Sequence, residues 1–301
     1  MKISAVVSTF NNESVIEDCL QSLAFVDEIV VVDHRSSDKT AQIAKKFTNR
    51  IYLEDNDPLN IDIQKNFGFE KAKGEWVLSV DSDERITPEL AREIKTVIES
   101  SQGFVAYKMK RKNIIFGKWI EHSLWWPDYK IRLFQKGKGH YATKQVHNEL
   151  AVDGQVGTMD EVLIHHHYQS ISEYLQKMDI YTENEALEMV KKNTHFNWID
   201  AVRMPVRDFL KTFFFQEGYK DGFHGLVLSI LQGFYMFLVV TKVWEKQGFH
   251  NSESENFIYE LQKEWNSLQK EVAYWFLTSF MTLTKNPVTR LTYKILRRRN
   301  T

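Results

Sequence analysis

Strand-like and helix-like segments alternate at short intervals through the first hundred residues. The strand-like segments are rich in β-branched residues, and one of them (EIVVV) is an almost continuous apolar run. Such a run is typical of a central parallel strand that helices cover on both faces. This order predicts a parallel α/β sheet with right-handed crossovers. We expect strands at residues 2–8, 28–32, 50–53 and 75–80, and helices at residues 14–23, 40–47, 63–72 and 87–99.

The pattern changes after residue 102. Short strand-like segments, separated by glycine and charged turns, predict an antiparallel extension of the sheet at residues 104–110, 114–119, 130–134 and 140–150. From residue 172 onward the pattern is helical. Within residues 254–280, apolar side chains recur at alternating spacings of three and four, which predicts a seam that packs against another helix of the chain. The seam comprises Ile258, Leu261, Trp265, Leu268, Val272 and Trp275.

Composition limits the classes of protein that fit. The single cysteine, Cys19, excludes an intrachain disulfide framework and a zinc site built from cysteines. The first residues lack the apolar stretch and cleavage site of a signal peptide, so we expect a cytoplasmic chain. The 39 Lys and Arg residues nearly balance the 40 Asp and Glu residues, but residues 285–301 hold six cations and no acid. An acidic body with a basic tail is poorly suited to bind a nucleic acid, and we expect no such partner.

Two segments predict contact with a membrane. The basic tail suits an anionic membrane surface, where each cation adds about 1 kcal/mol of attraction, and a solvated terminus is the alternative. Residues 225–241 form a stretch of 17 residues without a charge, near the lower limit of ~20 for a bilayer-spanning helix. A thin polar stripe of Ser229, Gln232 and Tyr235 favours a helix in the membrane interface. A buried core helix and a true membrane span are the alternatives.

Polar loops follow the predicted parallel strands, at residues 9–13, 33–40 and 81–84, and residues 64–66 open the helix before the fourth strand. Ligands bind where the carboxyl ends of such strands converge. Asp81 and Asp83 follow a buried strand, where unpaired carboxylates are costly, so we expect Mg²⁺ or Mn²⁺ as their partner. A helix N-terminus decorated with acids is the alternative. A metal there would neutralise a diphosphate leaving group.

The segments VVSTFNNE, VVDHRSSDKT and QKNFGFEKAKGEWVLSVDSDE together resemble the family 2 glycosyltransferases. The later segments YKIRLFQKGKGHY, VHNEL and KDGFHGLVLSILQGFYMFLVVTKVWE resemble the lipopolysaccharide-core glucosyltransferases within that family. The resemblance implies the GT-A nucleotide-sugar-binding fold, a Rossmann-like mixed sheet flanked by helices, with a helical C-terminal extension. It implies a catalytic domain of residues 1–170 and a helical, membrane-associating region of residues 171–301. Residues 1–100 would bind the nucleotide and residues 101–170 the acceptor.

The same resemblance implies roles for individual residues. Lys65 stands where the family commonly has Arg, and it supplies positive charge without the bidentate fork of Arg. Asp33 would bind the uracil and ribose, Asp81 the ribose or the metal, and Asp83 the metal more directly. The other residues implied at the nucleotide are Thr9, Asn11, Glu13 and Asn66.

Family membership also implies inversion at the anomeric carbon by a single displacement, which requires a carboxylate base near the acceptor hydroxyl. Asp128 and Glu149 are the candidates for that base, and Glu121 is a third. For each of them, an acid at a strand edge that faces water is the alternative. Trp125 and Trp126 are candidates for stacking on a sugar ring, with burial as the commoner outcome.

The run His165-His166-His167 resembles a metal site, but we do not expect it to be one. Adjacent residues on a strand point to opposite faces, so three in a row do not converge on one ion.

The sequence therefore predicts an inverting, metal-dependent glycosyltransferase. It would move a sugar from a nucleotide-diphosphate donor, a UDP-sugar, to a saccharide or lipid-linked acceptor in cell-envelope glycan or lipopolysaccharide-core synthesis. We expect it to be peripheral on the inner face of the cell membrane. One alternative is a nucleotidyltransferase, although such enzymes favour a glycine-rich loop that STFNNES lacks. Another is a non-catalytic, membrane-associated carbohydrate-binding or assembly protein that retains the fold.

Overall fold

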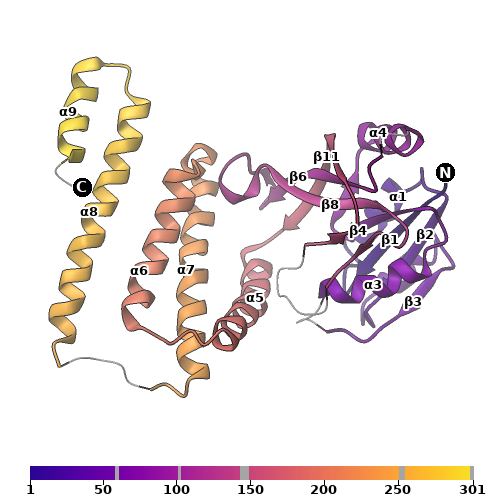
Figure 1. The fold of residues 1–301 in the computed structure, drawn as a ribbon, viewed down its shortest axis with the longest axis horizontal. Helices are drawn as coiled ribbons and strands as arrows, with labels where there is room; N and C mark the ends of the chain where they lie inside the picture. The colour runs from indigo at the N-terminus through magenta and orange to yellow at the C-terminus, as the bar shows by residue number, and fades with distance from the viewer. Residues whose placement is uncertain (58–60, 101–102, 143–148, 251–254, 299–301) are drawn as a thin grey trace. The chain divides into compact units, whose positions relative to one another are not determined.

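A computed structural model describes residues 1–57, 61–100, 103–142, 149–250 and 255–298. The chain divides into two compact units. The first consists of Met1–Trp119 and Trp125–Ile171, and the second of Ile120–Leu124 and Ser172–Thr301. Figure 1 shows the sheet of the first unit in indigo to magenta and the helices of the second in rose to yellow.

The first unit is built on a mixed sheet with the strand order β3-β2-β1-β4-β8-β6-β11-β5. β1 lies between β2 and β4 and runs parallel to both, and β3 runs parallel to β2. These neighbours confirm the predicted parallel sheet. The four strands are β1 (Ile3–Thr9), β2 (Glu28–Asp33), β3 (Ile51–Leu53) and β4 (Trp76–Asp81).

The rest of the sheet is mixed, which corrects the prediction of a purely antiparallel extension. β8 runs antiparallel to β4 and β6, but β11 runs parallel to β6 and antiparallel to β5. β11 was not predicted, because its apolar residues Val162–Ile164 stand between the acids Asp160 and Glu161 and a run of three histidines. Of the predicted strand at residues 140–150, residues 143–148 lie outside the described residues. The strands are β5 (Glu84–Ile86), β6 (Ala106–Ile115), β7 (Lys118–Trp119), β8 (Asp128–Gln135), β9 (Gly139–His140), β10 (Ala151–Val152) and β11 (Val156–Tyr168).

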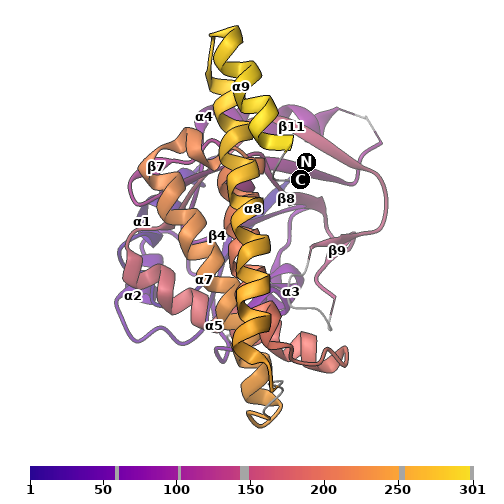
Figure 2. The same cartoon turned by 90° about the vertical axis from the view of Figure 1, so that its left-hand side faces the viewer.

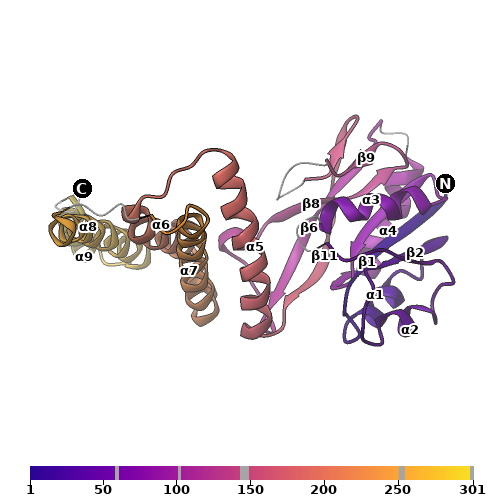
Figure 3. The same cartoon turned by 90° about the horizontal axis from the view of Figure 1, so that it is seen from below.

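Alternate residues of the central strands contribute to two apolar layers, one on each face of the sheet. Val7 of β1 lies in the same cluster as Leu20 of α1 and Ile94 of α4, whereas Val6 lies with Phe69 of α3. Figure 3 shows α1 and α2 on one side of the sheet and α3 on the other. The helices are α1 (Ile16–Ser22), α2 (Thr40–Ala44), α3 (Ile61–Lys71) and α4 (Pro88–Glu99).

Two local features place these helices. Thr87 caps α4 by accepting a hydrogen bond from the Leu90 amide, with Pro88 in the first turn, as predicted. Gly68 brings α3 close to the sheet, because a Cβ there would lie 2.5 Å from a methyl carbon of Val6. This approach positions the polar side chains of α3 at the ends of the strands.

The second unit is helical. α6 packs closely on α7, where a Cβ on Gly233 would lie 2.8 Å from the Pro205 carbonyl oxygen. The elements are α5 (Ile171–Lys191), α6 (Trp198–Leu210), a π-helical turn (Lys211–Phe215), a 3₁₀ turn (Gly218–Asp221), α7 (Phe223–Lys246), α8 (Phe257–Leu283) and α9 (Pro287–Arg298). Asp221 accepts hydrogen bonds from the amides of Glu121 and His122, which holds the segment Ile120–Leu124 in this unit.

The apolar stretch forms α7, which is long and apolar enough to cross a membrane by length and composition. A third of its most apolar window is buried within the protein. Two members of the predicted polar stripe bond neighbouring helices, because Gln232 donates to Asp208 of α6 at 2.8 Å and Tyr235 donates to Glu185 of α5 at 2.6 Å. The stripe therefore serves packing inside the unit.

The predicted seam of α8 packs only in part. Leu268 is buried, but Ile258 and Trp265 are 73% and 51% exposed. Arg203 and Arg207 of α6 bond Glu264 and Glu271 of α8 at 2.7 and 2.6 Å. The packed face is therefore centred on residues 264, 268 and 271, which share a helical face. The seam prediction was wrong at Ile258 and Trp265, because the packed face of α8 also contains ion pairs, which an apolar pattern does not reveal.

Candidate functional site

The predicted polar loops meet at one edge of the sheet. Thr9 at the end of β1 is paired in register with Asp33 at the end of β2, and Ser8 is paired with Asp81 at the end of β4. Thr9 and Asp33 are buried, at 3% and 1% exposure. The expected convergence of the first, second and fourth strands is therefore confirmed.

Hydrogen bonds join the loops after β1 and β2. Asn11, in the left-handed region with φ 51°, donates its amide to Ser36 Oγ at 2.8 Å and accepts from the Ser37 amide at 2.8 Å. A Glu13 carboxylate oxygen accepts from the Lys39 amide at 2.9 Å. Asn11 and Glu13 thus hold the two loops together, and their contact with a nucleotide stays a prediction.

Two further side chains, those of Asp33 and Asn12, hold the loops in place at the carboxyl ends of the strands. Asp33 Oδ1 accepts from the hydroxyl and the amide of Ser36, at 2.5 and 3.2 Å. Asn12, which the sequence analysis did not single out, accepts from the hydroxyls of Thr9 and Ser82 at 3.2 and 2.8 Å. Asn12 therefore links the first loop to the loop after β4. The contact with Ser82 joins residues that are 70 apart in sequence, so no local pattern indicates the role of Asn12.

A buried ionic network runs from α3 to β8. Lys65 Nζ lies 2.7 Å from Asp81 Oδ1, and Arg132 bonds both Asp81 and Glu84, the latter at 2.6 Å. Glu84 is fully buried and Arg132 is 4% exposed. Asn66 bonds the Tyr141 backbone through both ends of its amide, at 2.8 and 2.9 Å. Lys65 and Asn66 are thus committed to protein partners here, and their predicted nucleotide contacts remain predictions.

Opposite charges in this network offset the cost of burial at Asp81 and at Lys65. Burial alone would raise the pKa of Asp81, but Arg132 and Lys65 outweigh it and hold that pKa well below its ordinary value. Burial opposes the charge of Lys65 as well, yet Asp81, followed by Tyr141 and Asp62, raises its pKa above the ordinary range. Asp81 is therefore neutralised by protein cations, which leaves Asp83 as the more available metal ligand of the pair.

Asp83 meets two histidines of β11. Glu84 pairs in register with His165, so that the preceding residue, Asp83, lies beside the same strand. One ligand atom from each of Asp83, His165 and His167 lies within 4.8 Å of the others, and His165 Nε2 is 3.5 Å from Asp83 Oδ1. The three adjacent histidines do not converge together, as expected, but two of them form a candidate metal group with Asp83. Alternation along the strand separates His166 from its neighbours, but it also places residues two apart, His165 and His167, on one face.

Asn113 orients the His165 ring through Nδ1, the ring nitrogen that does not face Asp83. Asn113 is 1% exposed, and its side-chain amide donates to the Trp125 carbonyl at 2.8 Å. A carbonyl only accepts, so the Asn113 oxygen must face His165 Nδ1, 2.7 Å away. Nδ1 therefore carries a proton, and in the neutral ring the lone pair lies on Nε2, the atom 3.5 Å from Asp83 Oδ1. Histidines that ligate metals are held by a second partner in this way.

Of the two candidate bases, Asp128 is connected to this group. Arg111 donates to Asp128 Oδ2 through two nitrogens at 2.8 and 2.6 Å, and Asn113 donates to the same oxygen at 3.3 Å. Burial would raise the pKa of Asp128, but Arg111 and Lys130 hold it below its ordinary value.

The other candidates stand elsewhere. Glu149 is exposed, just before β10. Glu121 belongs to the second unit. Of the two tryptophans, Trp125 lies near the group, with its ring 5.5 Å from that of His167, whereas Trp126 packs edge-on against Trp119.

Comparison with known proteins places the chain among glycosyltransferases. It is 27% identical to an uncharacterised glycosyltransferase of Rickettsia typhi over 256 residues, covering 81% of this chain and 87% of that protein. It is 24% identical to the lipopolysaccharide core biosynthesis glycosyltransferase LpsC of Rhizobium meliloti over 258 residues, covering 82% and 94%. The crystal structure of Staphylococcus aureus TarS residues 1–349 with UDP-GlcNAc aligns with a TM-score of 0.44 at 19% identity, covering 81% and 83%.

The strand order and the family match together confirm the predicted GT-A fold, with its mixed sheet, flanking helices and helical C-terminal extension. The match covers residues 4–151, from β1 to the start of β10. Through these residues, the chain belongs to glycosyl transferase family 2.

Proposed function

We propose that this chain transfers a sugar from a UDP-sugar to a saccharide or lipid-linked acceptor of the cell envelope, with inversion at the anomeric carbon. The observation that carries the proposal is the group of Asp83, His165 and His167 beside the converged ends of β1, β2 and β4. A donor lying along this edge would place its diphosphate at the three side chains.

One carboxylate and two imidazoles suit a divalent cation that leaves coordination positions open for phosphate oxygens and water. The mixed nitrogen and oxygen set favours Mn²⁺ over Mg²⁺, which prefers oxygen ligands. A cation bound there would neutralise the charge that develops on the UDP leaving group. The cations of Lys65 and Arg132 are already paired with Asp81, so they are poorly placed to supply that charge.

Asp128 is the residue that we assign as the base. Arg111 and Asn113 bond its Oδ2, so its Oδ1, which lies 3.9 Å from Lys130 Nζ, is the oxygen that would face the acceptor hydroxyl. The lowered pKa of Asp128 keeps it ionised at neutral pH. The acceptor oxygen would form the new bond to the anomeric carbon and give its proton to Asp128. The bond from that carbon to the diphosphate would break, and UDP would leave with the electron pair.

The choice of donor and acceptor rests on different grounds. Asp33, which the family resemblance assigns to the uracil, is buried at the end of β2 next to Thr9. Trp125 beside His167 offers an aromatic face for a sugar ring. The relative LpsC, which the chain matches over 94% of its length, acts in lipopolysaccharide core biosynthesis. It supports a saccharide of the cell envelope as the acceptor class.

The test is metal-dependent binding and turnover of UDP-sugars by the full chain. We expect UDP to raise the melting temperature only when Mn²⁺ is present, and the variants Asp83→Ala and His167→Ala to lose both this shift and donor hydrolysis. His166→Ala is the matched control, because His166 lies on the other face of β11 and should leave both intact. Equal loss in all three variants, or normal hydrolysis by Asp83→Ala, would contradict the metal site. UDP binding without hydrolysis or transfer would favour a carbohydrate-binding role.

A further inference from the structure

α9 carries an apolar stripe on its outer face. Val288, Leu291 and Ile295 lie three and four residues apart, on one side of the helix, and are 72%, 57% and 50% exposed. A soluble helix normally buries such a stripe. Here the stripe continues onto the end of α8, where Leu283 is 63% exposed.

The opposite face of α9 is fixed against α8, along whose last turns it runs (Figure 2). The Tyr293 ring lies 5.5 Å from that of Phe280, and the Arg297 guanidinium lies 5.3 Å above the ring of Tyr274. Arg297 also donates to the hydroxyl of Thr278 at 3.5 Å. These contacts determine which side of α9 is outward, and they leave the apolar stripe on that side.

A row of cations lies on the flank of α9 between the apolar stripe and the face that packs against α8. Arg290, Lys294 and Arg298 follow one another at intervals of four residues, so they form a row along α9, and all three are exposed. The sequence of α9 contains no acid. Like charges at this spacing destabilise an isolated helix, and an anionic surface would relieve that repulsion. The row of cations therefore favours a negatively charged partner, and the apolar stripe favours a partner that is apolar below its surface.

An anionic lipid bilayer has both properties. In a helix lying in the membrane interface, apolar side chains reach the acyl chains while flanking Lys and Arg side chains extend to the phosphates. A second copy of the chain fits less well, because a two-fold contact across this face would set the same cations against each other. Charge and apolarity thus favour lipid over self-association.

We propose that α9 docks the chain onto an anionic membrane, with Val288, Leu291 and Ile295 in the acyl region and Arg290, Lys294 and Arg298 at the lipid phosphates. α7 contributes a separate exposed stripe of Ile230, Phe234 and Phe237 in the same unit. Its opposite side bonds Asp208 and Glu185, so crossing the bilayer would carry these acids into hydrocarbon. The docking is therefore peripheral, and it is independent of the chemistry proposed for the first unit.

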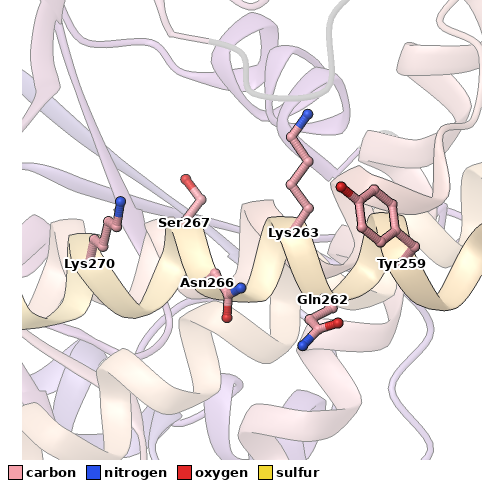
Figure 4. A pocket seen from close by; sticks show the side chains of 6 residues that line it. All are labelled: Tyr259, Gln262, Lys263, Asn266, Ser267 and Lys270. Atoms are coloured by element: carbon pink, nitrogen blue, oxygen red, sulfur yellow. The ribbon is translucent and has the colours of Figure 1, made fainter.

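The first experiment measures sedimentation of the full chain with vesicles of phosphatidylglycerol and phosphatidylcholine. We expect binding to mixed vesicles that weakens at high salt, and little binding to pure phosphatidylcholine. The variant Arg290→Gln/Lys294→Gln/Arg298→Gln should bind roughly 100-fold more weakly, since each basic residue accounts for roughly a fivefold change. The matched control is Lys192→Gln/Lys263→Gln/Lys270→Gln. It removes the same charge from exposed positions, two of which line a pocket on the polar face of α8 (Figure 4), and it should bind like the parent chain.

A second variant, Leu291→Glu/Ile295→Glu, tests the apolar stripe. It should lose vesicle binding while keeping its helical circular dichroism and its Mn²⁺-dependent stabilisation by UDP, so failure of docking is distinguishable from failure of the proposed activity. Unchanged binding by either α9 variant would overturn the proposal. Equal weakening in the triple-lysine control would mean that only the net charge of the chain matters for binding. A concentration-dependent dimer that Leu291→Glu/Ile295→Glu abolishes, without vesicle binding, would assign the face to a second copy.

Discussion

The two halves of the candidate site are held together in different ways. At the ends of β1 and β2, loop side chains bond the backbone of the neighbouring loop, as Asn11 does with Ser37. At β11, by contrast, the site depends on side chains brought together by strand pairing, such as His165 and Asn113, which are 52 residues apart in sequence. The first half joins two loops whose sequence patterns are each visible locally, although Asn11 and Ser37 are 26 residues apart, and the second exists only once the whole sheet has formed.

The buried ions lie at the boundary between these halves. Asp81 and Glu84 belong to the end of β4 and to β5, and Arg132 of β8 neutralises both. Arg111 extends the same network, since it lies 3.5 Å from Glu84 and bonds Asp128. We infer that this network sets the distance between the donor edge and the base. Changing each half separately is the way to test that division.

The largest expected effect is on the rate of transfer, at Asp128. Asp128→Asn keeps the shape of the side chain but removes the basic oxygen, so we expect transfer to fall by about 10²- to 10⁴-fold, the usual contribution of a general base. Steady-state transfer from a UDP-sugar to an accepted saccharide measures it. Mn²⁺-dependent UDP binding should remain, because the donor edge and Asp83 are unchanged.

Glu149→Gln is the companion variant for Asp128→Asn. Glu149 is exposed, and we expect the variant to retain most of the activity. If Glu149→Gln instead loses turnover and Asp128→Asn does not, the base belongs to the segment before β10. The catalytic base would then lie outside both halves of the candidate site.

The next effect is on stability, at Arg132. Replacing it by Met leaves the half-buried Asp81 and the fully buried Glu84 beside each other without their shared cation, and breaking a buried pair in this way costs about 3–5 kcal/mol in the free energy of unfolding. Urea denaturation followed by circular dichroism measures the change. Arg92→Met is the control, because Arg92 and Glu89 form an exposed pair at 2.8 Å that should contribute less than about 1 kcal/mol.

The dependence of folding stability on acidic pH should also test the pairing of Asp81 with Arg132. The pKa of Asp81 is depressed in the folded chain, so its contribution to stability is present above the unfolded value of about 3.9 and is lost as pH falls toward the depressed value. Without Arg132 the depression is smaller, so the variant should lose less stability between about pH 4 and pH 2 than the parent chain. A parallel acid profile for the two proteins would show that Arg132 does not set the pKa of Asp81.

The sequence was informative wherever one segment carried its own signal. The β-branched run of β2, the Thr87-Pro88 start of α4 and the polar residues at three strand ends each depend on neighbours in the chain. Those features predicted the parallel sheet and the convergence of Thr9, Asp33 and Asp81. The family resemblance added the GT-A fold, which the strand order and the family match then confirmed.

The remainder depends on pairings between distant segments. His165 and His167 became ligand candidates only because β5 pairs with β11, and no local pattern shows that pairing. Asn113 lies among the charges of β6, where nothing in AYKMKRKNII marks one amide as special. On α8, the packed face combines Leu268 with two ion pairs to α6, which a pattern of apolar residues does not reveal.

The smallest of these effects tests the β11 half directly, at Asn113. Asn113→Ala removes the acceptor of the His165 Nδ1 proton, so the ring loses the partner that directs Nε2 toward Asp83. Removing such a supporting residue lowers metal affinity by about 10- to 100-fold. Titration of Mn²⁺ in the presence of UDP, followed by calorimetry, measures the loss.

The variant Asn113→Asp distinguishes a role in orienting His165 from a purely structural role in the sheet. Aspartate still accepts the proton of His165 Nδ1, but it cannot donate to the Trp125 carbonyl or to Asp128. We therefore expect Asn113→Asp to keep the affinity for Mn²⁺ while it slows transfer through the disturbed Asp128. Equal losses of metal affinity in both variants, in step with equal losses of stability, would mean that Asn113 supports the sheet and does not orient His165. The β11 half would then be assembled by strand pairing alone.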